Sequence, residues 1–385
     1  MRVTIVGGGL QGVELCWLAR KAGWETLLVD SRSAPPALRL ADAFLRYDAT
    51  ALAADDGPTR EVMDRMAETA VVIPALENGP ALAALERACA RRGVPFAFDA
   101  RAYAVTASKL RSRELFLRCG TPIPRPAGDR PAFPLIAKPS GGSGSRGVRL
   151  LPDEAALNAY LPEGSAGWIL ESYCPGPSFS LEICGTPGRY RTFQTTELLM
   201  DAVFDCRAVL APACAPSAVV ARMETELVRL AEALELHGLM DLEVILGEDG
   251  IRVLEIDARF PSQTPTAVWL SSGVNLAEHL VSCFLPLTPQ PGFRVPRHAR
   301  YEHIAFHDGA FHFPGEHVMS GHGPLVPLRD WHGADEALVG GDPDGGDWVA
   351  TLLFTGTTAE DAEARRGRCL RELGVSGTSA SGGDA

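Results

Sequence analysis

Two runs of the chain carry acidic residues at a spacing that predicts a β-hairpin with one charged face. Residues 241–247 and 251–257 are apolar and rich in β-branched residues, as strands are. Between them lie Glu248, Asp249 and Gly250, and the glycine suits the left-handed position of a three-residue turn. Paired residues share a face, so this register gathers four carboxylates on one side. The predicted pairs are Gly247 with Ile251, Ile245 with Val253, Glu243 with Glu255, and Asp241 with Asp257.

The charged face predicts a cation site. Like charges directly opposite each other destabilise a sheet, so a stable hairpin of this kind needs cations between its acids. Ligands that are all oxygen favour Mg²⁺, which proteins bind through one or two carboxylates together with substrate phosphates. A solvated acidic face is the alternative. It does not explain why Arg259 and the polar run 262–264 follow at once.

The first hundred residues have the order of a nucleotide-binding α/β domain. A strand at 2–6 leads into GGGLQG at 7–12, then into a helix and a second strand that ends at Asp30. This is the dinucleotide-binding fingerprint, although many doubly wound domains carry it without binding NAD. A last strand is predicted at 95–98. Ligands are expected beyond the strand ends, where helix capping is the competing role. The residues there are Gln11, Asp30, Asp48, Glu77 and Asn78.

A lysine and a glycine-rich loop mark the next segment. Lys109 begins a basic helix, and a strand at 134–139 presents Lys138. Residues 140–147, SGGSGSRG, then lead into another strand at 148–151. A Walker loop leads into a helix instead, so this loop is predicted to be a flap of N–H donors that closes on phosphates. A surface hairpin without a ligand is the alternative.

The rest of the chain predicts a mixture of strands and helices. Five histidines between His303 and His322 recur every four or five residues, which gathers no common face on strands, so no metal site is expected there. Residues 376–385 are rich in Gly, Ser and Ala and predict a disordered tail. Strands are predicted at 168–173, 179–184, 190–199, 203–210, 301–306, 309–313, 318–320 and 348–354, and helices at 153–160, 215–236, 275–284 and 358–373.

Bulk properties narrow the class of protein. A length of 385 residues suggests two or three domains, and a net charge of −12 gives a nucleic-acid partner no general attraction. The nine cysteines form no CxxC pair, which argues against a disulfide framework or a zinc site and favours a reducing, cytoplasmic location. The chain starts directly with a strand, so no signal peptide is expected. No apolar run approaches the roughly 20 residues of a membrane span.

These features together resemble the ATP-grasp enzymes, and within them the ligases of pyrrolysine biosynthesis. LEIDARFPSQTPTAVWLSSGVNL at 254–276 carries most of the resemblance, with GGGLQG, ADAFLRYDAT, DLEVILG and YEHIAF in support. It implies an α/β protein whose ATP-grasp part is α+β, preceded by a Rossmann-like pre-ATP-grasp domain. The implied domains are 1–100, then a nucleotide-binding lid at 101–185, then a domain with the metal and substrate site at 186–375.

The same resemblance implies roles for individual residues in binding ATP and Mg²⁺. Lys138 and Arg259 would act on the transferring phosphoryl group and the acyl phosphate. Pro177 stands where such enzymes often carry an acid for the ribose. The implied metal ligands are Glu243, Glu255 and Asp257. The implied nucleotide-binding residues are Asp30, Asp48, Lys109, Lys138, Ser140, Gly141, Gly142, Ser143, Glu171, Ser172 and Tyr173.

The implied reaction joins (3R)-3-methyl-D-ornithine or D-ornithine to the ε-amine of L-lysine through an acyl phosphate. The partners would be these small amino acids, without nucleic acid or membrane, and a homo-oligomer stays open. A ligase for another amino-acid pair, a nicotinamide oxidoreductase and a nucleotide-binding sensor are the alternatives. Residues implied to hold the activated amino acid are Ser180, Glu182, Ser262, Gln263 and Thr264. Residues implied to meet the other substrate or to join this set are Leu10, Gln11, Glu77, Arg259 and Glu302.

Overall fold

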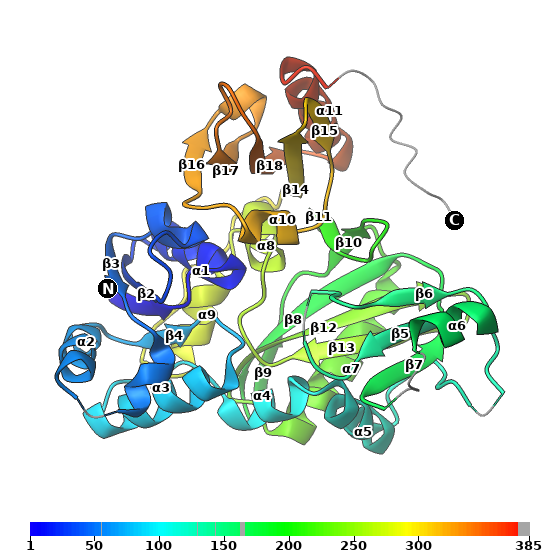
Figure 1. Ribbon diagram of the computed structural model, residues 1–385, viewed down its shortest axis with the longest axis horizontal. Helices are drawn as coiled ribbons and strands as arrows, with labels where there is room; N and C mark the ends of the chain where they lie inside the picture. Colours follow the sequence, from blue (N-terminus) through cyan, green and yellow to red (C-terminus); the bar gives the residue numbers. More distant parts are fainter. Residues whose placement is uncertain (55, 129, 143, 162–165, 376–385) are drawn as a thin grey trace.

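A parallel four-stranded sheet in the order β3-β2-β1-β4 forms the N-terminal part of the molecule, blue in Figure 1. The computed structural model describes residues 1–54, 56–128, 130–142, 144–161 and 166–375, so Ser143 and the predicted tail lie outside the described residues. Val3, Ile5 and Leu27 are fully buried, as a sheet covered on both faces requires. The elements are β1 (Arg2–Val6), α1 (Leu10–Lys21), β2 (Glu25–Asp30), η1 (Pro36–Leu40), β3 (Ala43–Arg46), η2 (Ala49–Ala53), α2 (Gly57–Ala67), β4 (Val72–Pro74) and α3 (Gly79–Arg92).

The glycine fingerprint works here through close backbone packing. A Cβ on Gly12 would lie 2.1 Å from the carbonyl oxygen of Gly7, and Gly7 itself has a φ of +106°. Only glycine therefore allows this tight turn between β1 and α1. The predicted strand at 95–98 is wrong, because only Phe96 pairs, in a single bridge with Val72, before the chain turns into the next helix at Ala100.

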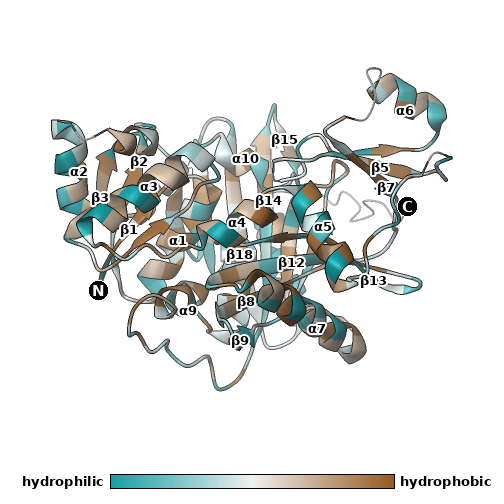
Figure 2. Cartoon of the chain, turned by 90° about the horizontal axis from the view of Figure 1, so that it is seen from below, coloured by the Kyte–Doolittle hydropathy of each residue, from teal (hydrophilic) through white to brown (hydrophobic). Residues whose placement is uncertain are grey.

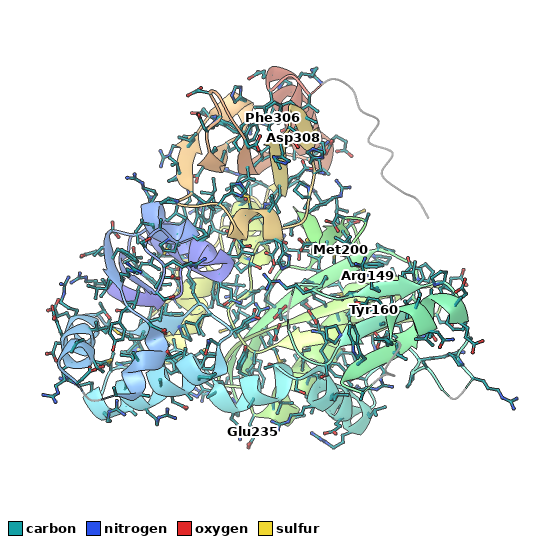
Figure 3. The ribbon with its side chains drawn as sticks, in the orientation of Figure 1. Arg149, Tyr160, Met200, Glu235, Phe306 and Asp308 are labelled. Carbon is teal, nitrogen blue, oxygen red and sulfur yellow. The ribbon has the colours of Figure 1, made fainter. Side chains whose placement is uncertain are left out.

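A small antiparallel sheet in the order β6-β5-β7 follows, and we call it the lid. Its core is Leu135, Ala137 and Leu151, and the guanidinium of Arg149 lies over the ring of Tyr160 on the lid (Figure 3). The predicted flap joins β5 to β6, which pair as an antiparallel hairpin. The elements are α4 (Ala100–Thr106), α5 (Lys109–Cys119), β5 (Leu135–Pro139), β6 (Arg149–Leu151), α6 (Glu154–Tyr160) and β7 (Trp168–Ser172).

The third sheet runs through most of the remaining chain in the order β13-β12-β8-β10-β11-β14-β18-β17-β16, with antiparallel neighbours. Helix α7 packs its apolar side, with Met223, Leu227 and Leu230, against β8 and β12 (Figure 2). β9 and β15 pair at its margins. The elements are β8 (Ser178–Thr186), β9 (Arg189–Thr192), β10 (Thr196–Met200), β11 (Cys206–Ala211), α7 (Ser217–Leu234), β12 (Gly238–Gly247), β13 (Gly250–Asp257), α8 (Thr264–Ser272), α9 (Leu276–Ser282), β14 (His298–His307), β15 (Ala310–His312), α10 (His317–Ser320), β16 (Val326–Arg329), η3 (Trp331–Gly333), β17 (Glu336–Gly341), β18 (Trp348–Gly356) and α11 (Ala359–Glu372).

The acidic hairpin is β12 and β13, at one edge of this large sheet. The predicted pairs Asp241 with Asp257 and Glu243 with Glu255 are confirmed. The predicted pairs nearer the turn are wrong, because the register shifts by one after Glu243 and the turn is shorter than expected. A β-bulge re-aims the strand locally, and here it separates the acidic end from the turn. The turn pairs are Val244 with Val253, Ile245 with Arg252, Leu246 with Ile251 and Gly247 with Gly250.

Other expectations fail where tertiary contacts decide local structure. The predicted strand at 318–320 is wrong, because the chain there forms the short helix α10. The run 190–199 is two strands, β9 and β10, and α8, β16 and β17 were not predicted. Strand β8 spans the predicted boundary at 185, and its pairing with β12 makes it part of the large sheet.

Helices α8 and α9 join the large sheet to the N-terminal part. The side-chain amide of Asn275 donates to the carbonyl oxygen of Leu18 at 2.9 Å, and the rings of Trp17 and Trp269 meet edge to face at 5.1 Å. These contacts fix α1, with the fingerprint glycines, against the segment that follows the acidic hairpin. Across the described residues, no helix combines the length and apolarity needed to cross a membrane.

Candidate active site

Three neighbouring cavities meet around the acidic hairpin. The lid cleft, about 120 Å³, lies between the lid and the hairpin. The acid pocket, about 80 Å³, lies over the four acids and the segment 261–264. The N-terminal pocket, about 440 Å³, opens between the ends of β1, β2 and β4 and the same segment. Glu243 and Glu255 line both the lid cleft and the acid pocket, so the hairpin acids are common to both.

The lid cleft has an apolar slot with charged groups beside it. Ile136 and Val148 come from the lid, and Ile245 and Leu254 come from the hairpin. A slot between two sheets with apolar walls suits a flat aromatic ring such as a nucleobase. The predicted hinge residues Glu171, Ser172 and Tyr173 line this cleft, together with Lys109, Lys138 and Gly142. Beside the hinge, Cys174 and Ser178 also line the cleft.

Lys138 is a buried cation at the floor of the lid cleft. Strand β5 positions it, and its Nζ lies 2.6 Å from Oε1 of Glu171 on the neighbouring strand β7. Its side chain also reaches toward the hairpin, where its Nζ lies 3.5 Å from the carbonyl oxygen of Leu254. The lysine therefore spans the cleft from the lid to the hairpin.

Lys109 connects the flap with the acidic hairpin. It lies in the first turn of α5, and its Nζ is 2.8 Å from Oε2 of Glu255 and donates to the carbonyl oxygen of Gly142 at 3.0 Å. Burial opposes its charge, but the carboxylate of Glu255 outweighs this effect and raises the pKa of Lys109. A second bond, from its backbone N–H to the carbonyl of Ser140, anchors the base of the flap.

The four hairpin acids are electrostatically unequal. Burial and the neighbouring Glu255 raise the pKa of Glu243, whereas Lys109 overcomes the effect of burial and lowers the pKa of Glu255. Burial and the neighbouring Asp257 raise the pKa of Asp241, whose Oδ1 has no hydrogen-bond partner among the described residues. The raised pKa values report the mutual repulsion of these carboxylates, which a further cation beside them would relieve.

The donor set fits a hard divalent cation. Glu243, Glu255 and Asp257 offer only carboxylate oxygens, which suit Mg²⁺. Within the described ranges, however, no three such side chains are already arranged as a metal site. Instead, Glu255 pairs with Lys109 and Asp257 pairs with Arg259, whose NH2 lies 3.0 Å from Oδ2. Lys109 and Arg259 therefore supply positive charge beside these carboxylates, and binding of Mg²⁺ by the same carboxylates is a proposal.

The predicted polar segment after the hairpin lies in the acid pocket. Ser180, Ser262, Gln263 and Thr264 all line it. Glu182 lies next to them in β8, fully buried, and burial raises its pKa to about 7. Its Oε2 has no hydrogen-bond partner in the described part of the chain. The pocket thus offers hydroxyls, an amide and a buried acid to a polar ligand.

Gln263 adopts a strained backbone conformation. Its φ is +65° and its ψ is −58°, and the N–H of Thr264 donates to the carbonyl oxygen of Ser262 at 2.7 Å. This is the uncommon γ-turn that side chains usually avoid. Buried side-chain bonds hold it, because Nε2 of Gln263 lies 2.9 Å from the carbonyl oxygen of Cys206 and 2.8 Å from Nε2 of His303.

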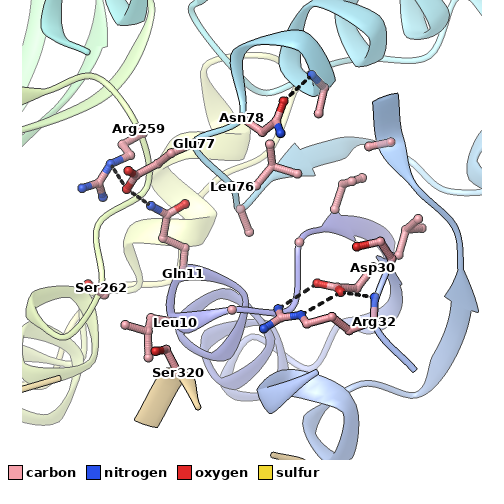
Figure 4. Close-up of a pocket in the computed structure, with 18 of the residues that line it drawn as sticks. Leu10, Gln11, Asp30, Arg32, Leu76, Glu77, Asn78, Arg259, Ser262 and Ser320 are labelled. Atoms are coloured by element: carbon pink, nitrogen blue, oxygen red, sulfur yellow. Dashed lines mark hydrogen bonds and ion pairs between the residues drawn. The ribbon is translucent and has the colours of Figure 1, made fainter. Parts of the chain in front are cut away.

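A chain of polar contacts crosses from the N-terminal pocket to the hairpin (Figure 4). The amide of Gln11 donates to Oε1 of Glu77 at 2.9 Å, and Nε of Arg259 lies 3.0 Å from the same oxygen. The other end of Arg259 pairs with Asp257. Burial opposes the charge of Arg259, but Asp257 and Glu77 outweigh it and raise its pKa further. The predicted residues Gln11, Glu77 and Arg259 are therefore brought together.

Asp30 and Asp48 lie apart from the lid cleft. Both line the N-terminal pocket, together with Leu10. Asp30 is occupied by Arg32, whose NH2 lies 3.0 Å from Oδ2, and by the backbone N–H of Gly8 at 2.6 Å. Asp48 caps η2 by accepting from the N–H of Thr50. The structure therefore places these two acids in a different cavity from Lys109 and Lys138, although Gly144 and Arg146 of the flap line the N-terminal pocket with them.

Glu302 is not brought to any of the three cavities. Its carboxylate is fully buried between Arg300, at 2.9 Å, and Arg366. Neighbouring residues of a strand point to opposite faces, and His303 faces Gln263 in the site. Glu302 therefore points away from the site, toward α11.

Sequence patterns missed several residues that line the cavities. Asp205, Glu316 and His317 are absent from the predicted set, yet Nδ1 of His317 lies 2.8 Å from Oδ2 of Asp205 beside the flap. Arg146 of the flap and Phe204 also line cavities. The signal that could have found this region is the turn-forming pair Pro314-Gly315 directly before Glu316.

A two-sheet cleft with a flap and a lysine, beside paired acids and a Rossmann-like domain, defines the ATP-grasp class. A protein-family model described as "ATP-grasp domain" matches residues 106–263. Among solved structures, N5-carboxyaminoimidazole ribonucleotide synthetase from Thermus thermophilus is similar with a TM-score of 0.69 and 21% identity, covering 96% of this chain and 98% of that one. A biotin carboxylase beta-gamma-ATP complex from Campylobacter jejuni is similar with a TM-score of 0.69 and 15% identity, covering 96% and 91%. These likenesses confirm the predicted fold.

A curated relative narrows the class. The 3-methyl-D-ornithine–L-lysine ligase of Methanosarcina mazei is 32% identical over 379 residues, which cover 96% of this chain and 95% of the relative. The chain belongs to the family of the 3-methyl-D-ornithine–L-lysine ligases, within the ATP-grasp fold.

Proposed function

We propose that the protein is an ATP-dependent ligase that joins 3-methyl-D-ornithine, or D-ornithine, to the ε-amine of L-lysine. The reaction would pass through an acyl phosphate on the first amino acid and would release ADP and phosphate. The observation that carries this proposal is that the acid pocket adjoins both other cavities: it shares Glu243 and Glu255 with the lid cleft and Arg259 with the N-terminal pocket. A nucleotide and two amino acids are three ligands that must meet at one reacting centre.

The lid cleft is the proposed nucleotide site. Its apolar walls suit adenine, and the hinge Glu171, Ser172 and Tyr173 lies along its edge. Lys109 and Lys138 and the flap amides would balance the charge of the phosphates at the acidic end of the cleft. The flap stands over this end, since Gly142 and Ser145 line the cleft. Closing the flap would exclude water from the acyl phosphate.

The acid pocket is the proposed site of the amino acid whose carboxylate is activated. Ser180, Gln263 and Thr264 line it, and Glu182 is buried beside Ser180 in β8. In-line attack by that carboxylate on the γ-phosphate needs positioning and charge balance rather than a side-chain nucleophile. Lys138 in the lid cleft and Arg259 in the acid pocket would balance the charge along this path, and Arg259 would stabilise the carbonyl oxygen as the acyl phosphate reacts.

Glu243, Glu255 and Asp257 are the residues that would hold Mg²⁺. When bound, the metal neutralises charge on the transferring phosphoryl group and orients it. The protein's own share of the chemistry is the register of β12 and β13, which sets Glu243 opposite Glu255 and Asp241 opposite Asp257. Lys109 pairs with Glu255 and also donates to the carbonyl oxygen of Gly142 in the flap. Binding of Mg²⁺ at Glu255 would therefore depend on the position of the flap.

The N-terminal pocket is the proposed site of L-lysine. Its volume, about 440 Å³, is within the range of small-molecule pockets. Gln11 and Glu77 lie at its inner end beside Arg259, and Leu10, Asp30 and Asp48 line its wall. The cytoplasmic location stays a prediction from the sequence, and the oligomeric state stays open.

The test is ADP release by the purified protein with ATP, Mg²⁺, D-ornithine and L-lysine. We expect ADP release that needs both amino acids for full rate, and a product whose mass equals their sum less one water. Omitting lysine should leave only slow ADP release, from hydrolysis of the acyl phosphate. No product with either ornithine substrate, but product with another amino-acid pair, would reject the substrates and keep the ligase class.

A nicotinamide oxidoreductase is the alternative from another class. The ribose of NAD would need the carboxylate of Asp30, which already accepts hydrogen bonds from Arg32 and from the N–H of Gly8. It also leaves the four hairpin acids without a role. Saturable NAD binding, together with no ADP release under the conditions above, would favour it over the ligase.

A further inference from the structure

Glu316 lies where the acid pocket and the N-terminal pocket meet. Four residues line both cavities: Gly144, Arg259, Ser262 and Glu316. Gly144 offers only backbone, Ser262 offers a hydroxyl, and Arg259 is a cation paired with Asp257 and Glu77. Glu316 is therefore the carboxylate among the residues at this junction.

One oxygen of this carboxylate is buried without a donor. Oε2 of Glu316 has no hydrogen-bond partner among the residues that the structure describes. A buried carboxylate oxygen that lacks a donor destabilises the protein unless something completes its bonding. A ligand that brings an N–H donor into the junction would complete it.

The backbone around Glu316 is held in place by acids that leave its own carboxylate available. The N–H of Gly315 donates to Asp201 at 3.1 Å, and the N–H of His317 donates to Asp205 at 3.1 Å. A Cβ on Gly315 would lie 2.0 Å from Cγ of Asp205, so this position requires glycine. Contacts this close fix the direction in which Glu316 leaves the backbone.

The junction is also where the second half of the ligation would take place. If lysine occupies the N-terminal pocket and the acyl phosphate forms in the acid pocket, the ε-nitrogen must enter the junction to reach the carbonyl carbon. Lysine carries an ammonium at neutral pH, with an unperturbed pKa near 10.4, and an ammonium is no nucleophile. We infer that Glu316 receives this ε-ammonium and takes a proton from it before attack. This inference rests on the proposed ligase function.

The proton balance of the step is complete. The carboxylate of Glu316 takes one proton from the ammonium, and the nitrogen lone pair then forms the C–N bond. The bond between the carbonyl carbon and the phosphate oxygen breaks, and its electron pair leaves with the phosphate. The second proton lost by the nitrogen goes to the phosphate, and Glu316 returns its proton to water when the product leaves.

The electrostatics of the junction support a proton acceptor. Burial raises the pKa of Glu316, against the lowering effects of Ser262, His317 and Arg259, and a raised pKa brings a carboxylate closer to that of the amine. Arg259 repels a protonated amine, so the positive charge is better held on the Glu316 side. The titratable and charged groups that face Glu316 are Glu14, Asp205, Cys206, Arg259, Tyr301 and His317.

The test separates acyl phosphate formation from amine attack in a Glu316→Gln variant. Hydroxylamine is largely uncharged at pH 7 and traps the acyl phosphate as a hydroxamate without needing a base. We expect hydroxamate from ATP and D-ornithine at a rate within about twofold of wild type, which also reports an intact fold. Isopeptide formation with L-lysine should fall by about 100-fold, as for loss of a general base. Glu86→Gln, exposed on α3, is the control with the same charge change and should leave both rates unchanged.

Alkaline pH gives a second readout that a structural role would not move. Between pH 7 and pH 9 the free amine fraction of lysine rises about tenfold per pH unit. Ligation by the Glu316→Gln variant should rise with it, whereas the wild type should rise much less. A Glu316→Asp variant keeps a base and should retain at least ten times the ligation rate of Glu316→Gln.

Three outcomes would overturn the inference. Ligation by Glu316→Gln within threefold of wild type would do so, as would equal losses of hydroxamate and isopeptide, which mark a structural role. Equal ligation rates for the Asp and Gln variants would also reject it. Wild-type protein that forms neither product from D-ornithine and L-lysine overturns the proposed function and this inference with it, so the two failures are told apart by the wild-type reaction.

Discussion

Arg259 shows how a single side chain joins two parts of the site. It leaves the chain two residues after Asp257, pairs back to that acid, and reaches Glu77 in the N-terminal domain. The spacing Glu-x-Asp-x-Arg in the sequence predicted that this arginine follows the acids. Its second partner comes from 182 positions earlier, and no local pattern connects the two.

Among the hairpin acids, Glu255 is the one whose substitution should lower the activity most. Its carboxylate balances Lys109 and would bind Mg²⁺, so Glu255→Gln removes both interactions while keeping the size of the side chain. We expect ADP release to fall by about 100-fold or more. The thermal midpoint should change little, because the side chain is partly exposed and like-charge repulsion is relieved.

The control for this substitution is Glu248→Gln, in the exposed turn of the same hairpin. It should leave ADP release unchanged. Near-normal ADP release by Glu255→Gln would remove the hairpin acids from the proposed chemistry.

Residues could be predicted from the sequence where local register sets their positions. The acidic pairs follow from strand alternation, and they were confirmed even though the register near the turn was wrong. Glu316 and His317 could not be predicted, because Asp201 and Asp205 place them through contacts more than a hundred residues apart in sequence. Glu302 lies against Arg300 and Arg366, and a strand with polar residues on both faces does not reveal from sequence which face each residue takes.

At the scale of elements, the flap is set against α10. Gly144 has a φ of +62°, and a Cβ there would lie 2.4 Å from Cε1 of His317, which Asp205 holds in place. Gly144→Ala should therefore push the flap away from its closed position. We expect isopeptide formation to fall by about tenfold, with more ADP released per product as water reaches the acyl phosphate.

Gly120→Ala, at the end of α5, is the matched control, since its φ of +65° is close to that of Gly144 and a Cβ there meets nothing within 4 Å. The ratio of ADP to isopeptide measures the coupling for both variants. An unchanged ratio in Gly144→Ala would show that the flap closes without this contact.

The γ-turn at Gln263 gives a second prediction for an element. Gln263→Ala and Gln263→Gly both lose the bonds to Cys206 and His303, so the difference between them reports the backbone alone. With a φ of +65°, the Gly variant should be more stable than the Ala variant by about 1 kcal/mol. The measurement is the free energy of unfolding from urea titration.

At an ordinary position glycine is the less stable of the two, so the sign of the difference is the result. An Ala variant equal to or more stable than the Gly variant would mean that the segment 262–264 relaxes once the side chain is gone.

Elements of regular pattern were largely predictable, and elements made by long-range contacts were not. The fingerprint glycines, the flap hairpin and helix α7 follow from local sequence. Helix α8 is almost fully buried on every side, so it lacks the polar face that marks a helix in a sequence. Strand β17 depends on pairing with β18, and β16 on pairing with β17, rather than on their own composition.

At the scale of the whole molecule, Glu14 ties the N-terminal domain to the rest. It lies in α1, fully buried, and accepts bonds from the hydroxyl and the N–H of Thr266 in α8 and from the hydroxyl of Tyr301 in β14. Burial raises its pKa to about 7, above the value of about 4.5 expected for an unfolded glutamate. The neutral acid is therefore the form that suits the interface.

The sign of the pH effect follows from this difference. The contribution of neutral Glu14 to the free energy of unfolding is fully present below about pH 4.5. It is lost as the pH rises to about 7, because the folded protein keeps a proton that the unfolded chain has released. Glu14→Gln has no proton to lose. Between pH 5 and pH 8 its free energy of unfolding should gain about 2 kcal/mol relative to wild type.

Urea titrations of both proteins at several pH values make the measurement, with Glu61→Gln, exposed on α2, as the control. Parallel stability curves for wild type and Glu14→Gln would show that this carboxyl is charged in the folded protein across the whole range, which would contradict a raised pKa.

The order of strands in the large sheet has a consequence for folding during synthesis. Strand β18, at residues 348–356, lies between β14 and β17 and completes the hydrogen bonding of both. On a ribosome, β14 must wait for some forty further residues before its partner emerges, with His303 and its hold on Gln263 still unsupported. Pairing of such sequence separation forms slowly and leaves strand edges exposed in the meantime. The nascent chain therefore has its glycine fingerprint and its acidic hairpin long before it has the sheet that holds them in working register.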